Sequence, residues 1–249
     1  MYYIVFDLEF NQDFTSIQLP GNKTSSFPFE IIQIGAVKLD SSMNTVASFD
    51  RYVKPTVYSQ ISPFITELTG ITTEQLVNEK TFPEVYHDFI EFIEDSDSVF
   101  CIWGKTDMKE IFRNAEYFKL EHRLLPKQFI DLQPYASLHL NQPPKKLLRL
   151  QYTVEALEIP LTFPFHNALH DAYYTAEVFK KIRKPSIQPK LYEPIYINVS
   201  TKLRQPKRTI DFDALYTQFE KMYDRPISEE ERGIIKLAYQ MGKTGQFIK

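Results

Sequence analysis

The feature that most constrains this chain is its N-terminal run, residues 2–10 (YYIVFDLEF), which is apolar and β-branched until two acids interrupt it. Such continuous runs are typical of strands buried on both faces. Because side chains alternate along a strand, Asp7 and Glu9 should point to the same face. Two carboxylates at the end of a buried strand need a partner, and oxygen ligands of this kind suit Mg²⁺ or Mn²⁺. The same pair also fits two solvated acids at a strand end, so this spacing alone leaves both interpretations open.

The segments after this strand predict a sheet and its covering helices. Residues 30–40 and 45–55 are strand-like and would form a three-strand meander with the first strand. Apolar residues then recur at helical spacing, with two short apolar runs between the helices. The predicted helices are 62–70, 72–76, 82–95, 107–118, 152–159 and 168–182, and the predicted later strands are 97–103 and 128–132. This order predicts an α/β fold with a central mixed sheet flanked by helices.

Composition excludes several classes of protein. Hydrophobic residues make up 43% of the 249 residues, which is enough for a packed core and excludes a disordered chain. No two of the 7 glycines have G-x-G-x-x-G or G-x-x-x-x-G-K spacing, which excludes a standard dinucleotide fingerprint and a standard P-loop. Cys101 is the only cysteine, so neither an intrachain disulfide nor a cysteine-based zinc site is expected.

Targeting signals are also not evident in the sequence. The N-terminal run has no basic region before it and stops at Asp7, unlike a signal peptide. No apolar stretch approaches the roughly 18 residues that a membrane span needs. A single cysteine favours a reducing compartment, and we therefore expect a cytoplasmic location without membrane contact.

Charge divides the chain into an acidic body and a basic tail. Residues 1–179 carry 14 Lys and Arg against 24 Asp and Glu, a net charge of -10, whereas residues 180–249 carry 15 against 8, a net charge of +7. Between Lys180 and Arg208 there are nine basic residues and one acid. Two amphipathic helices are predicted beyond this stretch, with Asp211 and Ser228 as candidate caps. We expect a catalytic body at 1–182 and a C-terminal extension at 183–249.

Two further groups of polar residues stand out, and each has an ordinary structural explanation. Asp107 follows a predicted strand and could simply cap the next helix. His166 and Asp171 lie in the run HNALHD, where a capping histidine and a solvated acid would serve equally well.

As a set, these motifs carry more information than they do singly. The D-L-E of the first strand, WGKTDMKEI around Asp107 and HNALHDA around Asp171 together resemble the DnaQ-like DEDDh exonucleases. The segments EIIQIGAVKLD and VKPTVYSQISPFITELTGITTEQL also resemble that family, and the similarity covers about residues 1–182. The second segment is most similar to the branch that trims small interfering RNAs and histone-mRNA ends, whose bacterial relatives include KapD-type exonucleases. The resemblance implies an RNase H-like fold.

The resemblance also implies roles for the acids and the histidine. Four acids (Asp7, Glu9, Asp107 and Asp171) would hold two Mg²⁺ or Mn²⁺ ions, with Asp7 bridging them and Asp107 acting largely through water. His166 would be the general base, since an imidazole titrates near working pH. His170 is the competing base, but adjacent helical residues point about 100° apart, so it should face away from the ions.

The implied activity is 3′–5′ hydrolysis of single-stranded RNA or DNA from its 3′ end, releasing nucleoside 5′-monophosphates. The candidate contacts for the terminal nucleotide are Leu8, Phe10, Thr69, Gly70 and Ile71. Phe10 could stack on a base or belong to the core, and Trp103 is predicted to lie in the core. The alternatives are a non-catalytic RNase H-fold protein that binds nucleic acid or a regulatory partner, and an endonuclease of the same fold. RNA or DNA preference, oligomeric state and protein partners are not predicted.

Overall fold

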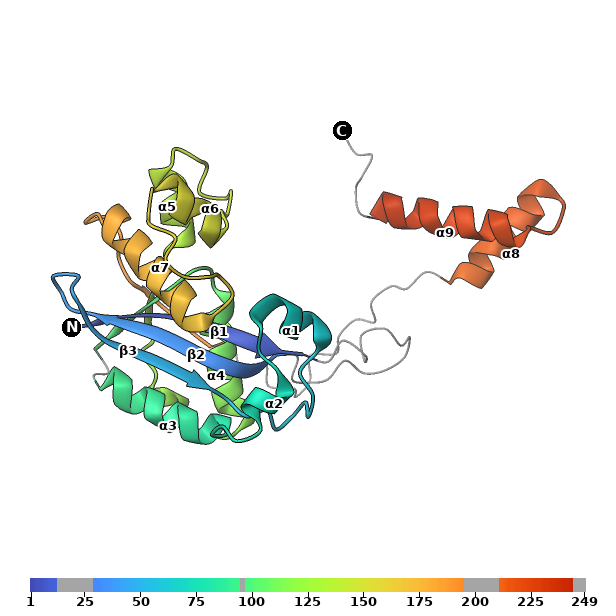
Figure 1. Ribbon diagram of the computed structural model, residues 1–249. Coiled ribbons are helices and arrows are strands. Elements are labelled where there is room, and N and C mark those ends of the chain that lie inside the picture. Colours follow the sequence, from blue (N-terminus) through green and yellow to red (C-terminus); the bar gives the residue numbers. More distant parts are fainter. Residues whose placement is uncertain (13–28, 95–96, 195–210, 244–249) are drawn as a thin grey trace. The chain divides into compact units, whose positions relative to one another are not determined.

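The computed structural model describes residues 1–12, 29–94, 97–194 and 211–243 (Figure 1). The chain folds into two compact units, Met1–Ile195 and Tyr196–Lys249. No helix among the described residues has the length and apolar character needed to cross a membrane.

The first unit is built on a six-stranded mixed sheet with strand order β3-β2-β1-β4-β5-β6. The three N-terminal strands pair antiparallel and form the predicted meander, whereas β4 runs parallel to β1 and β5 parallel to β4. The strands are β1 (Tyr3–Asn11), β2 (Glu30–Leu39), β3 (Thr45–Tyr52), β4 (Val99–Ile102), β5 (Gln128–Asp131) and β6 (Lys190–Leu191). The predicted mixed sheet flanked by helices is therefore confirmed.

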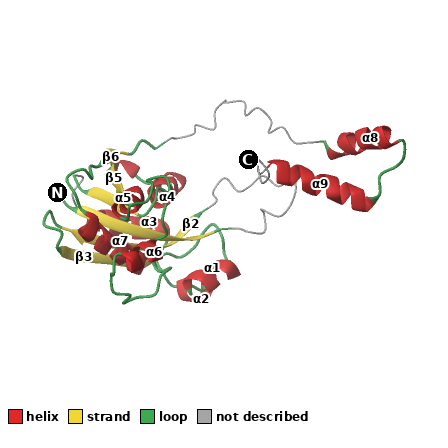
Figure 2. Ribbon diagram, turned by 90° about the horizontal axis from the view of Figure 1, so that it is seen from above, coloured by secondary structure: helices red, strands yellow, loops and turns green. Residues whose placement is uncertain are grey.

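Helices cover both faces of this sheet (Figures 1 and 2). Helices α3 (Phe82–Ile93) and α4 (Thr106–Tyr117) pack on the face that carries Ile4, Phe6 and Leu8 of β1. Helix α7 (Ala168–Ile182) packs on the opposite face, over Val5, together with α5 (Gln133–His139) and α6 (Leu150–Ala156). Because side chains alternate along β1, Asp7 and Glu9 share the face of Val5, beneath α7.

The short helices α1 (Pro63–Thr69) and α2 (Thr73–Leu76) lie side by side near the C-terminal end of β1 (Figures 1 and 2). Pro63 opens α1, and Gly70 ends it in the left-handed conformation at φ 75°. Thr72 caps α2 by accepting a hydrogen bond from the Gln75 backbone N–H.

Three elements of this unit were not predicted: α5, a 3₁₀ turn at His122–Leu124, and β6. The strand β6 has only two residues, which pair antiparallel with Gln128 and Phe129 of β5. Short elements of this kind depend on a neighbour in the fold, and their sequences show too few periods to reveal them.

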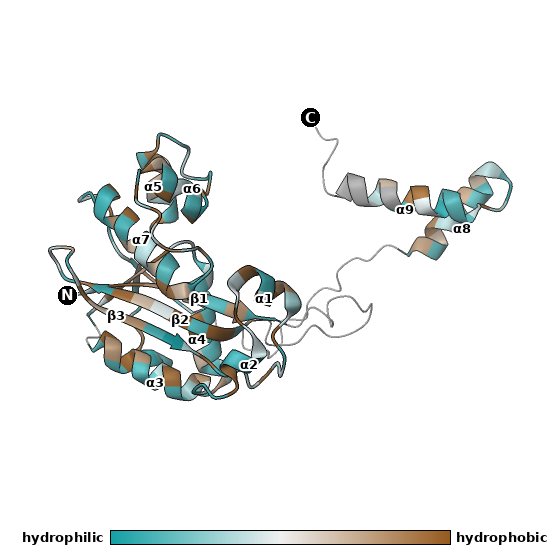
Figure 3. Cartoon of the chain, in the orientation of Figure 1, coloured by the Kyte–Doolittle hydropathy of each residue, from teal (hydrophilic) through white to brown (hydrophobic). Residues whose placement is uncertain are grey.

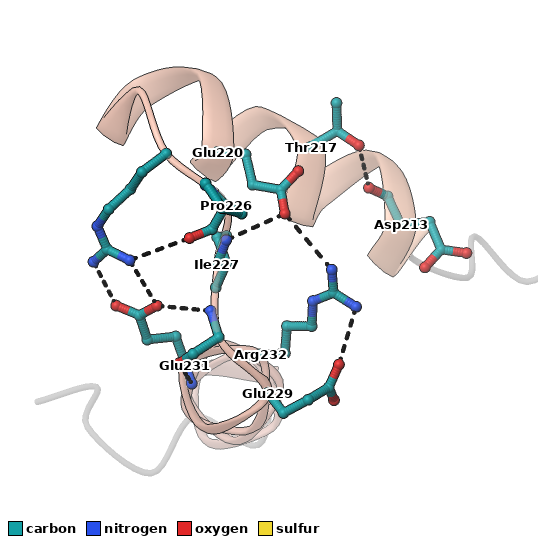
Figure 4. A network of polar contacts seen from close by, with 10 residues as sticks. Asp213, Thr217, Glu220, Pro226, Ile227, Glu229, Glu231 and Arg232 are labelled. Atoms are coloured by element: carbon teal, nitrogen blue, oxygen red, sulfur yellow. Dashed lines mark hydrogen bonds and ion pairs between the residues drawn. The ribbon is translucent and has the colours of Figure 1, made fainter.

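The second unit contains α8 (Phe212–Tyr223) and α9 (Glu229–Lys243). Both predicted caps are confirmed, because the Asp211 side chain accepts from the Ala214 N–H at 3.0 Å and the Ser228 hydroxyl accepts from the Glu231 N–H at 3.3 Å. A polar network closes the turn between the helices (Figure 4), in which Glu231 binds Arg225 at 2.7 and 3.1 Å. Figure 3 shows that α8 carries both hydrophobic and hydrophilic residues, as its amphipathic sequence predicts.

Candidate active site

Three of the predicted acids come together at the C-terminal half of β1. Asp7, Glu9 and Asp171 each place a carboxylate oxygen within 4.8 Å of the other two. Asp7 and Glu9 come from β1, and Asp171 comes from the first turn of α7, more than 160 residues later in the chain. The predicted strand alternation and the predicted helix start at residue 168 together produce this cluster.

A single glycine allows α7 to come this close to the sheet. Gly35 of β2 is paired with Asp7 across the β1–β2 ladder, so both face α7. A Cβ atom at Gly35 would lie 2.0 Å from the Leu169 backbone nitrogen and 2.1 Å from the Ala168 carbonyl carbon. The first turn of α7 therefore rests on the bare backbone of β2. The sequence analysis did not identify Gly35, although an isolated glycine within a strand is a known sign of close backbone approach.

Asp107 approaches the site from helix α4, which follows β4, the strand that pairs with β1. It lies in the first turn of α4 and is only 7% exposed, while Lys105 occupies the N-cap position. The alternative interpretation of Asp107 as a helix cap is therefore wrong. The turn before it is fixed by Asp131, whose carboxylate accepts from the backbone N–H of Gly104 at 3.1 Å. Because β1 and β4 are parallel, their C-terminal ends meet at one edge of the sheet, which brings Asp107 toward the cluster.

Burial and mutual repulsion dominate the electrostatics of these acids. Burial raises the pKa of Asp7 well above its usual value, and the charges of Asp107, Glu9 and Asp171 raise it further. Burial, followed by the charges of Asp171 and Asp107, raises the pKa of Glu9 to about 8. Asp7 is thus the carboxylate that is affected by all three others, and either protons or a metal cation would offset the negative charge gathered at the site.

The remaining two acids are shifted in the same direction. Burial raises the pKa of Asp107 to about 8, and the charges of Asp171 and Glu110 add to this effect. Burial raises the pKa of Asp171 to about 6, although a hydrogen bond from the His166 backbone N–H opposes the shift.

The donor atoms fit a hard divalent cation. Every ligand in the cluster is a carboxylate oxygen, which is the donor that Mg²⁺ and Mn²⁺ prefer. The Oδ1 atom of Asp171 is buried without a hydrogen-bond partner among the described residues, whereas its Oδ2 accepts from the His166 N–H at 3.2 Å. A buried carboxylate oxygen without a donor is costly, and coordination of a metal ion would satisfy it.

The two candidate histidines differ in what holds their rings. His166 is exposed, its backbone adopts a left-handed conformation at φ 64°, and no described residue hydrogen-bonds to its ring. The His170 ring is half-buried, with Nδ1 3.1 Å from the Pro164 carbonyl oxygen, and stacks on Phe163 at a centroid distance of 4.7 Å. The His166 ring is therefore available for proton transfer, and the His170 ring is committed to packing.

The predicted nucleotide contacts divide into buried and accessible residues. The side chains of Leu8 and Ile71 are 4% and 3% exposed and lie in hydrophobic clusters, so only their backbone could meet a substrate. Phe10 is half-buried and packs against Phe29 at 5.7 Å. Gly70 is exposed in the turn after α1.

Thr69 holds that turn together rather than pointing freely outward. Its hydroxyl donates to the Ile65 carbonyl at 2.8 Å and accepts from the Ile71 N–H at 3.1 Å. The accessible part of the predicted nucleotide site is therefore the backbone of the turn at Gly70 and the exposed edge of Phe10. The role of all five residues in binding stays a prediction.

Two other aromatic residues belong to the packing of the first unit. Trp103 is partly buried against the α7-side core, and its indole N–H donates to the Leu148 carbonyl at 3.2 Å. Tyr192 packs against Phe112 and Phe129 at 5.0 and 6.0 Å.

The matches to curated relatives cover about three quarters of the chain. The chain is 32% identical over 194 residues to a PolC-type DNA polymerase III of Thermotoga maritima, which covers 75% of this chain and 12% of the polymerase. It is 25% identical over 193 residues to 3′-5′ exoribonuclease 1 of Rattus norvegicus, which covers 74% of this chain and 55% of the relative. The chain thus spans about an eighth of one relative and about half of the other.

A solved structure has the same fold. The nuclease domain of 3′hExo, a DEDDh family member bound to rAMP, matches with a TM-score of 0.64 at 22% identity, over 78% of this chain and 97% of that domain. The family model described as Exonuclease (RNase_T) matches residues 4–179, which include all four acids and His166. The chain therefore belongs to the RNase T/DnaQ-like family of 3′–5′ exonucleases, in its DEDDh branch.

Proposed function

We propose that this protein removes nucleotides from the 3′ end of single-stranded nucleic acid in a two-metal reaction, with His166 as the general base. The observation that carries the proposal is the convergence of Asp7, Glu9 and Asp171 within 4.8 Å, with the buried Asp107 close enough for its charge to raise the pKa of Asp7 and Glu9. A non-catalytic relative of the same fold would have no need to retain four mutually repelling acids, whose burial is costly. This argument disfavours a purely regulatory function.

The four acids would hold the metal ions, since the charges of the other three all act on Asp7. When bound, two Mg²⁺ or Mn²⁺ ions supply a hydroxide nucleophile at neutral pH and stabilise the leaving oxygen. The chain itself orients Asp171 through the His166 backbone N–H, which donates to its Oδ2 atom at 3.2 Å. The same peptide unit carries the imidazole, so the proton acceptor and the carboxylate are positioned together.

His166 would take the proton from the attacking water. Its ring is exposed and lies next to the acid cluster in sequence and through the backbone contact with Asp171. An imidazole ring nitrogen can accept a proton, as a general base must. The leaving group would be a nucleoside 5′-monophosphate, which is the chemical class of the rAMP bound to the 3′hExo domain.

We propose that both RNA and DNA single strands are substrates. One relative is named as an exoribonuclease and another as a DNA polymerase, so the names of the relatives cover both kinds of nucleic acid. Discrimination between them depends on a few hydrogen bonds to the 2′-hydroxyl.

The test uses one oligonucleotide sequence as RNA and as DNA, each labelled at its 5′ end or its 3′ end. With Mg²⁺, the 3′ label should be released first as a mononucleotide, and the 5′-labelled strand should shorten stepwise. EDTA should stop the reaction, and an Asp7→Asn protein should be inactive. Internal cleavage products would support the endonuclease alternative, and binding without cleavage would support the non-catalytic alternative.

A further inference from the structure

A buried glutamine lies between the acid cluster and the outer strand of the meander. Gln33 of β2 is fully buried and is paired with Glu9 on one side and with Tyr52 of β3 on the other. It therefore shares the face of the sheet that carries the catalytic acids. A polar side chain at such a position needs hydrogen-bond partners, because burying an amide without them is costly.

Both ends of the Gln33 amide are paired. Its Oε1 atom accepts from the Ala168 backbone N–H at 3.2 Å, and its Nε2 atom donates to the Asp50 carboxylate at 2.9 Å. A carboxylate can only accept, so Asp50 fixes which end of the amide faces α7. Asp50 thus orients Gln33, and Gln33 presents an acceptor to the helix.

The hydrogen bond from the Ala168 N–H to Gln33 lies in the segment that carries the proposed base, His166, and the proposed metal ligand Asp171. Ala168 is the first residue of α7 and is fully buried, so water cannot satisfy its backbone N–H. It lies between His166 and Asp171, which are themselves joined by the hydrogen bond from the His166 N–H. Residues 166–171 therefore form a hydrogen-bonded turn, and the Gln33 side chain bonds this turn to the sheet.

A second contact attaches the same turn to β3. The side chain of the N-cap residue Asn167 lies near the Tyr52 hydroxyl, and its oxygen accepts from the His170 N–H at 3.2 Å. Tyr52 is the residue paired with Gln33, so neighbouring positions of β2 and β3 hold neighbouring residues of the helix start. The sheet thus specifies the position of the helix start, whereas the Gly35 contact specifies its height above the sheet.

We propose that Gln33, oriented by Asp50, is a positioning residue that sets where His166 and Asp171 stand relative to Glu9. This inference rests on the proposed function of those three residues. It predicts that loss of the Gln33 acceptor moves the base and one metal ligand together. The rate of hydrolysis and the affinity for Mg²⁺ should then fall together, while binding of the oligonucleotide changes little.

The experiment compares Gln33→Met, which keeps the side-chain length but removes the acceptor, with Gln151→Met as a matched control on exposed α6. For Gln33→Met, kcat and Mg²⁺ affinity should fall by about 10–100-fold, as is typical when a group behind a metal ligand is lost. KM for a short oligonucleotide should change by less than threefold, and Gln151→Met should match the wild type. A folded Gln33→Met protein with wild-type kcat and Mg²⁺ affinity would overturn the proposal.

A second pair of variants covers the case in which Gln33→Met does not fold. Asp50→Ala removes only the orienting acceptor from a half-buried position, and it should lower kcat, whereas Asp50→Asn offers a carbonyl oxygen to Gln33 and should restore it. Equal activity of the two Asp50 variants would also contradict the proposal.

Mg²⁺ binding, measured by calorimetry without substrate, separates the positioning role of Gln33 from the proposed nuclease function. If the wild type binds Mg²⁺ but cleaves nothing, the proposed function fails, and the loss of Mg²⁺ affinity in the Gln33 and Asp50→Ala variants still tests the positioning.

Discussion

Replacement of Gly35 by alanine should disable the site from a position that touches neither metal nor substrate. The added Cβ would lie 2.0 Å from the Leu169 nitrogen, whereas ordinary contacts begin at 3.4 Å. The neighbouring atoms are backbone and cannot rotate away, so the first turn of α7 must move outward by about 1.4 Å, the difference between these two distances. That turn carries Asp171, and the sheet residue opposite Gly35 is Asp7.

The expected size of the effect follows from this displacement. A misplacement of about 1 Å in a catalytic group can cost about 10²-fold in rate, so Gly35→Ala should lower kcat by at least about 100-fold. Overpacking of a core contact typically costs about 1–3 kcal/mol, so the protein should stay folded with a lower Tm. Affinity for Mg²⁺ should also fall, because Asp171 leaves the group of three carboxylates.

The assay is Mg²⁺-dependent release of a 3′-terminal nucleotide under saturating substrate, with circular dichroism and thermal unfolding as checks of the fold. Gly233→Ala is the matched control, because Gly233 lies in α9 and a Cβ there would meet nothing within 4 Å. Alanine also favours a helix over glycine, so this variant should retain full activity. Wild-type kcat in a folded Gly35→Ala protein would refute the reasoning that α7 rests on this residue.

Three further predictions follow from the site and the fold. Single substitutions Asp7→Asn, Glu9→Gln, Asp107→Asn and Asp171→Asn should each abolish nuclease activity in a folded protein, and wild-type turnover in any of them would exclude that acid as a metal ligand. His166→Ala should slow hydrolysis by about 10²–10⁴-fold, as for a lost general base, whereas His170→Ala should cost far less activity; the reverse order would identify His170 as the base. A chain that ends at residue 194 should keep its activity on a dinucleotide. A chain that ends at residue 183 lacks β6 and Tyr192, so its Tm should be lower than that of the chain ending at 194. Equal Tm values for the two chains would contradict the assignment of these residues to the first unit.

The sequence was sufficient to predict the parts of the site that depend on local pattern. Alternation along β1 placed Asp7 and Glu9 on one face, and helical periodicity predicted α7 over the range in which it is found. The motif resemblance added Asp107 and His166. These predictions succeeded because strand and helix periods are properties of short windows of sequence.

The residues that the sequence analysis missed act through contacts between distant segments. Gly35 and Gln33 look like an ordinary glycine and an ordinary polar residue within a strand, and their partners lie about 135 residues away in α7. A glycine within a strand signals close approach of another backbone, but local pattern does not identify the partner, so only the fold reveals these tertiary contacts.

The mutual repulsion of the acids predicts how the metal-free protein responds to pH. Burial and neighbouring charges raise the pKa of Glu9 and Asp107 to about 8, and burial raises that of Asp171 to about 6, above the values near 4 of an unfolded chain. Between about pH 4 and pH 8 the folded state therefore binds more protons than the unfolded state, so a rise in pH destabilises the fold.

The corresponding measurement is Tm in EDTA at about pH 5 and about pH 9, compared between the wild type and Asp107→Asn. The variant lacks one of the repelling charges, so its Tm should exceed that of the wild type by more at the higher pH than at the lower. Added Mg²⁺ should raise the wild-type Tm most at the higher pH, where protons no longer compete for the carboxylates. A Tm difference between variant and wild type that is independent of pH would show that Asp107 is not held in a repelling, buried environment. The loss of activity in Asp107→Asn could then not be attributed to the removal of a carboxylate charge whose burial destabilises the fold.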